Sequence, residues 1–243
     1  MQKDVIVIGA GLAGMVAAST AQEEGAEVIL IDRSSIGIGT NSAISNGVFA
    51  GPTSSYSPED YTRDTLKIGK MINNEASVKI VAREAPDAFK FLRSKGISLE
   101  ELSDCHVLKS SGPDVIRGVP MVKKLAKNIK SLERVNILTN FYVTEIWREG
   151  NQLRGVKGID KTGRKISVYA PAVVMANGGA GAIYLRNDNQ KSMMGQGYFL
   201  AAKAGLELWD MEFVQFYPIV MAEPRLPSIM LPTPYPREAR LIN

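Results

Sequence analysis

The chain has 243 residues, 45% of them hydrophobic, and a formal net charge of +4. This length and apolar content suit one α/β domain or slightly more, and the mild charge without a dense basic patch excludes a nucleic-acid-binding protein. The single cysteine, Cys105, excludes an internal disulfide and a thiol-rich metal or iron–sulfur site, so we expect a cytoplasmic chain without a metal. The uncharged stretch 166–185 is broken by Pro171 and three glycines, so we expect no transmembrane helix.

A glycine-rich turn follows the first predicted strand. Residues 4–8 (DVIVI) form an apolar run, the motif GAGLAG occupies residues 9–14, and a helix is expected over 12–24. A second apolar strand, 27–31, ends in Asp32. This spacing is typical of a dinucleotide-binding fold, in which the glycines allow a tight turn, the approach of a pyrophosphate and close helix packing. We expect Asp32 to accept hydrogen bonds from a ribose hydroxyl.

The next segment, 34–57, contains no charged residue and is rich in small residues and hydroxyls. A solvated loop of this length would normally carry charges, whereas a loop around a cofactor needs small side chains and free N–H groups. We therefore expect the segment to wrap a cofactor, and the alternative is a flexible linker. The residues that supply these groups are Thr40, Asn41, Ser42, Ser45, Asn46 and Gly47.

Helical patterns follow over 58–69, 74–95 and 122–132. His106, the only histidine, lies between the last two of them, and we expect a surface or loop histidine, with a general base as the alternative. For Cys105 we expect a buried or inert thiol, because no second cysteine is present to resolve a redox thiol.

Strands are predicted near 136–138, 142–148, 153–160 and 165–169, and we assign residues of about 135–170 to a small antiparallel insertion. The insertion interrupts an α/β fold in which helices flank a parallel sheet. Its glycine-containing turns indicate hairpins between neighbouring strands.

The chain then returns to the parallel sheet. Residues 172–176 (AVVMA) predict a buried strand, and the glycine-rich turn 177–181 indicates that the backbone approaches a ligand at the carboxyl end of that strand. A further helix is expected over 198–204, after the sequence MGQG.

Together these segments resemble the FAD-containing flavoproteins of the succinate dehydrogenase and fumarate reductase family, which also includes L-aspartate oxidase. GAGLAG and Asp32 resemble the pyrophosphate and ribose sites for FAD, and GTNSAISNGVFAG resembles the segment that wraps the flavin. VVMANGGAGAIY resembles the family's strand and glycine turn, and MGQGYFLAAKAGLELWDMEFVQFYP resembles its TGDG and DMEFVQFHP segments. The resemblance implies a Rossmann-like FAD-binding domain over 1–220 and the start of a capping domain at 221–243.

The resemblance also implies a set of FAD-binding residues. They are Gly9, Ala10, Gly11, Leu12, Ala13, Gly14, Asp32, Arg33, Ser34, Thr40, Asn41, Ser42, Ser45, Asn46, Gly47, Val143, Ala176, Asn177, Gly178 and Gln196.

The departures from the family pattern bear on chemistry. Thr40 stands where many respiratory members have the histidine that bonds the flavin covalently, so we expect non-covalent FAD. Gln196 replaces the acid of the TGDG turn. Tyr217 replaces the histidine that contacts a substrate carboxylate, and a tyrosine supplies no positive charge near pH 7.

Three residues remain as substrate candidates. Arg237 and Arg240 survive from the family's arginine-rich segment and could clamp carboxylates, the alternative being surface arginines. Tyr217 is the third candidate, the alternative being a packed core aromatic. The family's proton-donor arginine would lie beyond Asn243, so the catalytic residue is unassigned and we expect an N-terminal portion, either a fragment or one half of a split protein.

The resemblance implies an FAD-dependent oxidoreductase of the succinate dehydrogenase/fumarate reductase type, acting on CH–CH groups. A hydride would pass between the flavin N5 and a dicarboxylate-like substrate. The alternatives are an electron-transfer flavoprotein subunit, a reductase for another substrate and a catalytically silent FAD-binding fragment. The implied partners are an iron–sulfur electron-transfer subunit and a separate C-terminal half, and the chain would be at most peripheral to a membrane through a partner.

Overall fold

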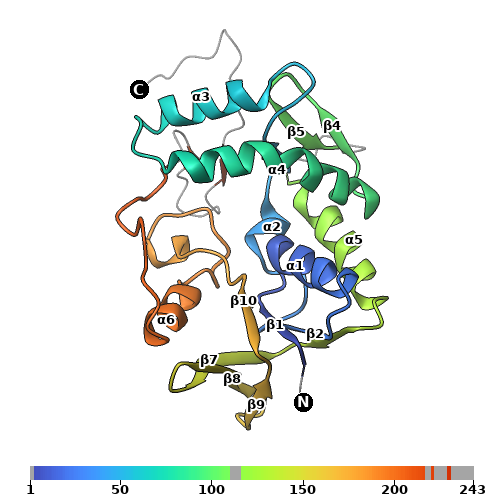
Figure 1. Ribbon diagram of the computed structural model, residues 1–243, viewed down its shortest axis with the longest axis vertical. Coiled ribbons are helices and arrows are strands. Elements are labelled where there is room, and N and C mark those ends of the chain that lie inside the picture. The colour runs from blue at the N-terminus through green and yellow to red at the C-terminus, as the bar shows by residue number, and fades with distance from the viewer. Residues whose placement is uncertain (1–2, 110–115, 217–219, 222–228, 231–243) are drawn as a thin grey trace.

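A four-stranded parallel sheet forms the centre of the molecule (Figure 1). The structure is a computed structural model that describes residues 3–109, 116–216, 220–221 and 229–230. In spatial order the strands of the sheet are β10 (Ala172–Met175), β1 (Val5–Ile8), β2 (Val28–Ile31) and β6 (Val135–Leu138).

The central strand β2 is buried along its whole length because both faces of the sheet are covered. Alternate residues of a strand point to opposite faces. Leu30 faces the helices α1 (Leu12–Glu23) and α5 (Gly118–Lys130), whereas Ile29 faces a second, antiparallel sheet. The continuous apolar run of β2 is therefore explained by two hydrophobic cores, one on each side.

The antiparallel sheet contains β7 (Phe141–Glu149), β8 (Gln152–Asp160) and β9 (Lys165–Tyr169), and it lies at the bottom of Figure 1. These three hairpin-connected strands agree with the predicted insertion. The predicted start at residue 135 is wrong, however, because β6 pairs in parallel with β2. A four-residue apolar strand carries no sequence signal that distinguishes a parallel from an antiparallel partner.

A helical pair and a small sheet lie beyond the parallel sheet. Helices α3 (Pro58–Ile68) and α4 (Glu75–Ser94) run side by side at the top of Figure 1. Beside them, at the upper right of Figure 1, β5 pairs in antiparallel fashion with β4, and it also pairs with β3. The small sheet was not predicted, and its strands are β3 (Val48–Ala50), β5 (Cys105–Leu108) and β4 (Leu99–Glu101).

His106 corrects a second expectation. It was expected at the surface or in a loop, but it lies on β5 with only 3% of its surface exposed. Its Nε2 lies 2.9 Å from the carbonyl oxygen of Pro52, and its ring packs against Phe89 with the centroids 4.0 Å apart. Arg93 approaches Nδ1 at 3.4 Å. This buried ring packs α4 against the small sheet. It is not accessible to solvent, as a general base acting on a substrate would need to be.

The strand predicted over 172–176 is present as β10, but it is half exposed rather than buried, with 39% of Val174 accessible. The reason is its position, because β10 is an edge strand of the described sheet. Among the described residues, no helix combines the length and apolar character needed to cross a membrane. The remaining short elements are α2 (Asn41–Ile44), a 3₁₀ turn at Gly181–Ile183, α6 (Gln196–Lys203), β11 (Val220–Met221) and β12 (Ile229–Met230).

Candidate functional site

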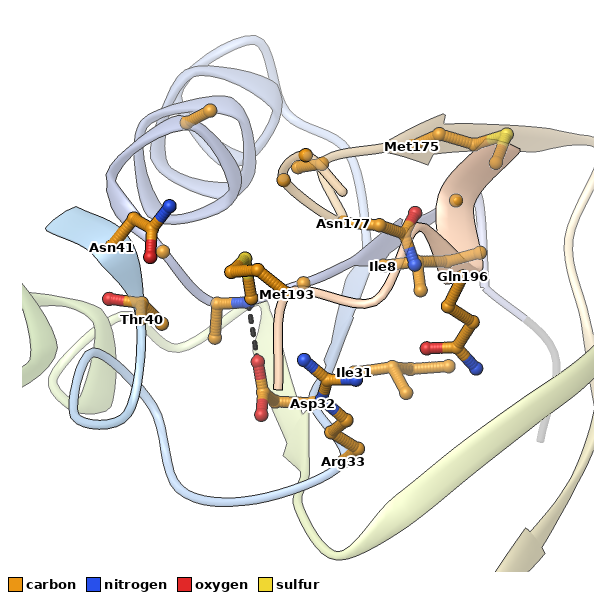
Figure 2. Close-up of a pocket in the computed structure, with 18 of the residues that line it drawn as sticks. Ile8, Ile31, Asp32, Arg33, Thr40, Asn41, Met175, Asn177, Met193 and Gln196 are labelled. Carbon is orange, nitrogen blue, oxygen red and sulfur yellow. Dashed lines mark hydrogen bonds between the residues drawn. The ribbon is translucent and has the colours of Figure 1, made fainter. Parts of the chain in front are cut away.

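A cavity of about 540 Å³ opens at the carboxyl ends of the parallel strands. The last residues of β1, β2 and β10, which are Ile8, Ile31 and Met175, contribute to its wall (Figure 2). The N-terminus of α1 and the beginning of α6 complete it. This edge of an open parallel sheet is the usual place for a ligand in α/β folds.

The three motif glycines have different structural reasons. A Cβ on Gly9, which has a φ of +101°, would lie 2.2 Å from the carbonyl oxygen of Ala176. A Cβ on Gly14 would lie 1.7 Å from the carbonyl oxygen of Gly9. For Gly11 the nearest atom is Ser42 Oγ at an ordinary 3.4 Å. The packing of the chain thus requires Gly9 and Gly14, whereas Gly11 leaves open space toward the cavity.

Asp32 stands at the end of β2 and joins three parts of the site. Its Oδ2 accepts a hydrogen bond from the backbone N–H of Ala10 at 2.8 Å, drawn as the dashed line in Figure 2. Its Oδ1 accepts from the N–H and hydroxyl of Ser34 at 2.8 and 3.0 Å. An ionised carboxylate has about four acceptor sites, so Asp32 can still accept a ribose O–H.

The predicted cofactor loop divides into two parts. Thr40, Asn41 and Ser42 line the cavity, and Ser42 Oγ accepts a hydrogen bond from the N–H of Leu12 at 3.1 Å. Thr40 caps the short helix α2 by accepting from the N–H of Ala43 at 3.3 Å. These contacts hold the loop against the first turn of α1.

The second part of this loop does not line the cavity, because Ser45, Asn46 and Gly47 are not among its lining residues. The carbonyl oxygen of Ser45 accepts from the N–H groups of Arg117 and Gly118, and that of Gly47 accepts from Leu108. These bonds attach the loop to α5 and β5, so the structure gives Ser45 and Gly47 a role in loop anchoring.

Two amide side chains stand on the other side of the cavity from Thr40 and Asn41 (Figure 2). Gln196, the first residue of α6, donates a hydrogen bond from Nε2 to the carbonyl oxygen of Val143 at 2.7 Å. Asn177 follows β10, and its buried Oδ1 has no hydrogen-bond partner among the residues that the structure describes. A buried acceptor without a partner is costly, and a donor group of a ligand in the neighbouring cavity would complete it.

Most of the sequence-predicted residues meet at this cavity, namely Gly9, Ala10, Gly11, Leu12, Ala13, Asp32, Arg33, Ser34, Thr40, Asn41, Ser42, Val143, Ala176, Asn177, Gly178 and Gln196. Gly14 supports it from behind through its contact with Gly9. The substrate candidates Tyr217, Arg237 and Arg240 lie outside the described residues.

The sequence analysis missed several lining residues. The last residues of the parallel strands could have been found, because strand ends in an α/β sheet meet at one edge. Met193 carried no comparable signal, since it precedes the MGQG segment, whereas Tyr198 directly follows MGQG in a segment that the sequence analysis had already singled out. The missed residues are Ile8, Ile31, Gly39, Phe141, Met175, Gly179, Met193, Gly197, Tyr198 and Ala201.

Cys105 is partly buried on β5, and burial, followed by the neighbouring Asp104 carboxylate, raises the pKa of its thiol. Because the thiolate is the reactive form, we expect Cys105 to react with iodoacetamide more slowly than a free cysteine at pH 7.5. The midpoint of its rate–pH profile should lie above that of the same protein unfolded in guanidinium. Equal midpoints for the folded and unfolded protein would contradict this expectation.

Comparison with known proteins bears directly on this cavity. A protein-family model described as an FAD binding domain matches residues 4–234. The chain belongs to this family. The match includes every described residue of the cavity, so the expected cofactor FAD and the Rossmann-like fold class are confirmed.

Relatives of this FAD binding domain support the wider resemblance. L-aspartate oxidase of Xylella fastidiosa (strain 9a5c) is 30% identical over 231 residues, which cover 89% of this chain and 44% of the relative. L-aspartate oxidase of Clostridium perfringens is 26% identical over 224 residues, covering 88% and 50%. The solved Sdh1 of Mycobacterium smegmatis in complex with UQ1 is 27% identical, with a TM-score of 0.82 over 96% of this chain and 43% of that one. The chain thus spans about half the length of these relatives, or less.

The residues of the cavity fit FAD. Gly11 leaves a space that a Cβ would fill, at a helix N-terminus whose N–H groups suit a pyrophosphate. Asp32 keeps acceptor capacity for a ribose, and Asn177 Oδ1 lacks a partner in the described part of the chain. A cavity of about 540 Å³ is within the range of cofactor sites.

Proposed function

We propose that the chain forms the FAD-binding part of an FAD-dependent oxidoreductase that moves a hydride between the flavin and a dicarboxylate-like substrate. The observation that carries the proposal is the cavity at the strand ends, where Gly11 opens the N-terminus of α1 toward the space. Relatives named L-aspartate oxidase support the substrate class, because aspartate is a dicarboxylic amino acid.

In this proposal the residues of the chain bind and orient the cofactor. The N–H groups at the start of α1 hold the pyrophosphate, and Asp32 accepts hydrogen bonds from the ribose. Oδ1 of Asn177 accepts a hydrogen bond from a donor group of the cofactor. When bound, FAD supplies hydride transfer at N5, and the protein supplies orientation and exclusion of water. Thr40 lacks a ring nitrogen that could bond the flavin, so attachment is non-covalent.

The proposal also concerns substrate binding and partner chains, for which the residues lie outside the described part of the chain. Arg237 and Arg240 clamp the substrate carboxylates, and Tyr217 donates a hydrogen bond to one of them. Residues 1–220 form the FAD-binding domain, and residues 221–243 begin a capping domain. A polypeptide equivalent to the rest of the longer relatives completes the substrate site, and an iron–sulfur subunit exchanges electrons. Tyr217, in place of the family histidine, specifically favours one alternative, a reductase for another substrate.

The proposal is tested by incubating the purified chain with FAD, removing free flavin and unfolding the protein. We expect about one FAD per chain, all of it released on unfolding because no covalent bond is formed. Dye-linked turnover is then measured with succinate, L-aspartate and fumarate, with and without a co-expressed polypeptide equivalent to the remainder of the relatives. No FAD binding would refute the proposal, and FAD binding without turnover in the complete assembly would favour a silent FAD-binding module.

A further inference from the structure

Two loops far apart in the sequence meet across the cavity. We call residues 189–193, which lie between β10 and α6, the strap. The strap lies against residues 33–41, which follow β2, and both segments contribute cavity-lining residues. Side-chain hydrogen bonds join them across about 150 positions of the chain, with sequence separations of 148 and 149 at Asn41.

Asn41 makes the first connection with both ends of its amide. Its Nδ2 donates to Oδ1 of Asn189 at 2.6 Å, and its Oδ1 accepts from the backbone N–H of Gln190 at 2.9 Å. The neighbouring chain leaves room for this pair, because a Cβ on Gly181 would lie 2.2 Å from Asn189 Nδ2. Hydroxyls and a neutral imidazole also donate and accept, but only asparagine and the longer glutamine carry a donor nitrogen and an acceptor oxygen on one planar amide.

A second connection lies further along the strap. The guanidinium of Arg33 donates to the carbonyl oxygen of Ser192, and the hydroxyl of Ser192 donates to the carbonyl oxygen of Gly39 at 3.4 Å. Next to it Met193 turns inward and lines the cavity, with 7% of its surface exposed (Figure 2). Its Sδ occupies the space beside Gly178, where a Cβ would approach within 2.8 Å.

We propose that the strap retains the cofactor, and that Asn41 and Asn189 are positioning residues that set the rate at which FAD leaves. This inference rests on the proposed FAD binding. A cofactor seated on the first turn of α1 would lie beside both Asn41 and Met193, since both line the same cavity. The two segments are joined around that space, so release requires the strap to separate from residues 33–41.

The connection should therefore act on dissociation more than on association. Replacing Asn41 with alanine removes two hydrogen bonds, and each typically contributes modestly to stability. We expect FAD to leave Asn41→Ala about 10- to 100-fold faster than the wild-type chain. The association rate should change less than about threefold, because affinity differences within one interface reside mostly in dissociation.

The test is stopped-flow displacement of FAD from the full chain for wild type, Asn41→Ala, Asn189→Ala and the double variant, with an excess of a different apoflavoprotein, whose bound flavin has a distinct absorbance, as the trap. The two single variants should share the faster release, and the double variant should be less than additive because the residues form one contact. Asn136→Ala, at an exposed position on β6, is the matched control and should release FAD at the wild-type rate. Thermal unfolding of the flavin-free proteins shows whether a variant is less stable, so that faster release of FAD can be distinguished from a general loss of stability.

Each outcome decides a different point. If wild type binds FAD but both single variants release it at the wild-type rate, the strap inference is overturned and the proposed function stands. Faster release that is fully additive in the double variant would also overturn it, because the two asparagines would then act separately. If wild type binds no FAD at all, the proposed function fails and the strap inference fails with it. Should Asn41→Ala not fold, Asn189→Ala, on the strap itself, tests the same contact.

Discussion

Replacing Gly11 with valine should weaken the affinity for FAD by about 100-fold while leaving the chain folded. A Cβ at this position meets only ordinary contacts within the protein, the nearest being Ser42 Oγ at 3.4 Å. Gly11 has an extended backbone with φ −74° and ψ −170°, which a β-branched residue adopts without strain. The added methyl groups instead occupy the space that the pyrophosphate needs. An overpacking cost of up to about 3 kcal/mol corresponds to a loss of about 100-fold in affinity.

The measurement is the dissociation constant for FAD from quenching of flavin fluorescence, together with circular dichroism of the unliganded protein. Gly11→Ala, with a single added carbon, should fall between wild type and Gly11→Val. A valine variant that folds and binds FAD with the wild-type dissociation constant would show that the cofactor does not lie on this turn. A variant that fails to fold would contradict the open space that the structure places beside Gly11.

The sequence was sufficient for the part of the fold that depends on local pattern. The order of strand, glycine turn, helix, strand and acid predicted β1, α1, β2 and Asp32, because each feature has a local physical cause. The hairpins of β7, β8 and β9 were also predictable, since their turns contain Gly150 and Gly163, both with positive φ.

Pairing between distant segments was not predictable in the same way. The small sheet joins β3 to β5 across more than 50 positions, and each of its strands has only three or four residues. Its presence explains why His106 is buried, because the sheet places Phe49 opposite His106 and Phe89 packs against both rings. The edge position of β10 likewise depends on the whole sheet rather than on its own four residues.

In the site, too, some features follow from the local sequence and others depend on contacts between distant segments. Asp32 was predicted as a ribose acceptor, but its bonds to Ala10 and Ser34 also make it the internal brace of the glycine turn. Met193 lines the cavity from a strap that is bonded to Asn41, 149 positions away from Gln190, and the local sequence does not predict such a contact. The motif glycines and polar lining residues such as Thr40 and Gln196 are thus readable from sequence, whereas the place of Met193 in the cavity wall becomes visible only in three dimensions.

Gly14→Ala should destabilise the protein far more than any change at Gly11, although the two positions belong to one motif. Its Cβ would lie 1.7 Å from the carbonyl oxygen of Gly9, a backbone atom that the turn holds in place. Relief would require α1 to move away from β1, in the core that contains Met15 and Val7. We expect a loss of about 3 kcal/mol or more, the upper end for overpacking, and a fall in melting temperature of about 6–12 °C.

Thermal and urea unfolding of the flavin-free chain measure this effect without interference from cofactor binding. The control is Gly150→Asn in the β7–β8 turn, where φ is +59° and a Cβ would meet no atom within 4 Å. Because asparagine adopts this left-handed conformation more readily than most residues, the control should stay within about 1 kcal/mol of wild type. If Gly14→Ala and the control have the same melting temperature, α1 does not contact the glycine turn as closely as the structure requires. A large loss at Gly14 beside a small one at Gly11 would separate the glycine that packs the helix from the glycine that admits the cofactor.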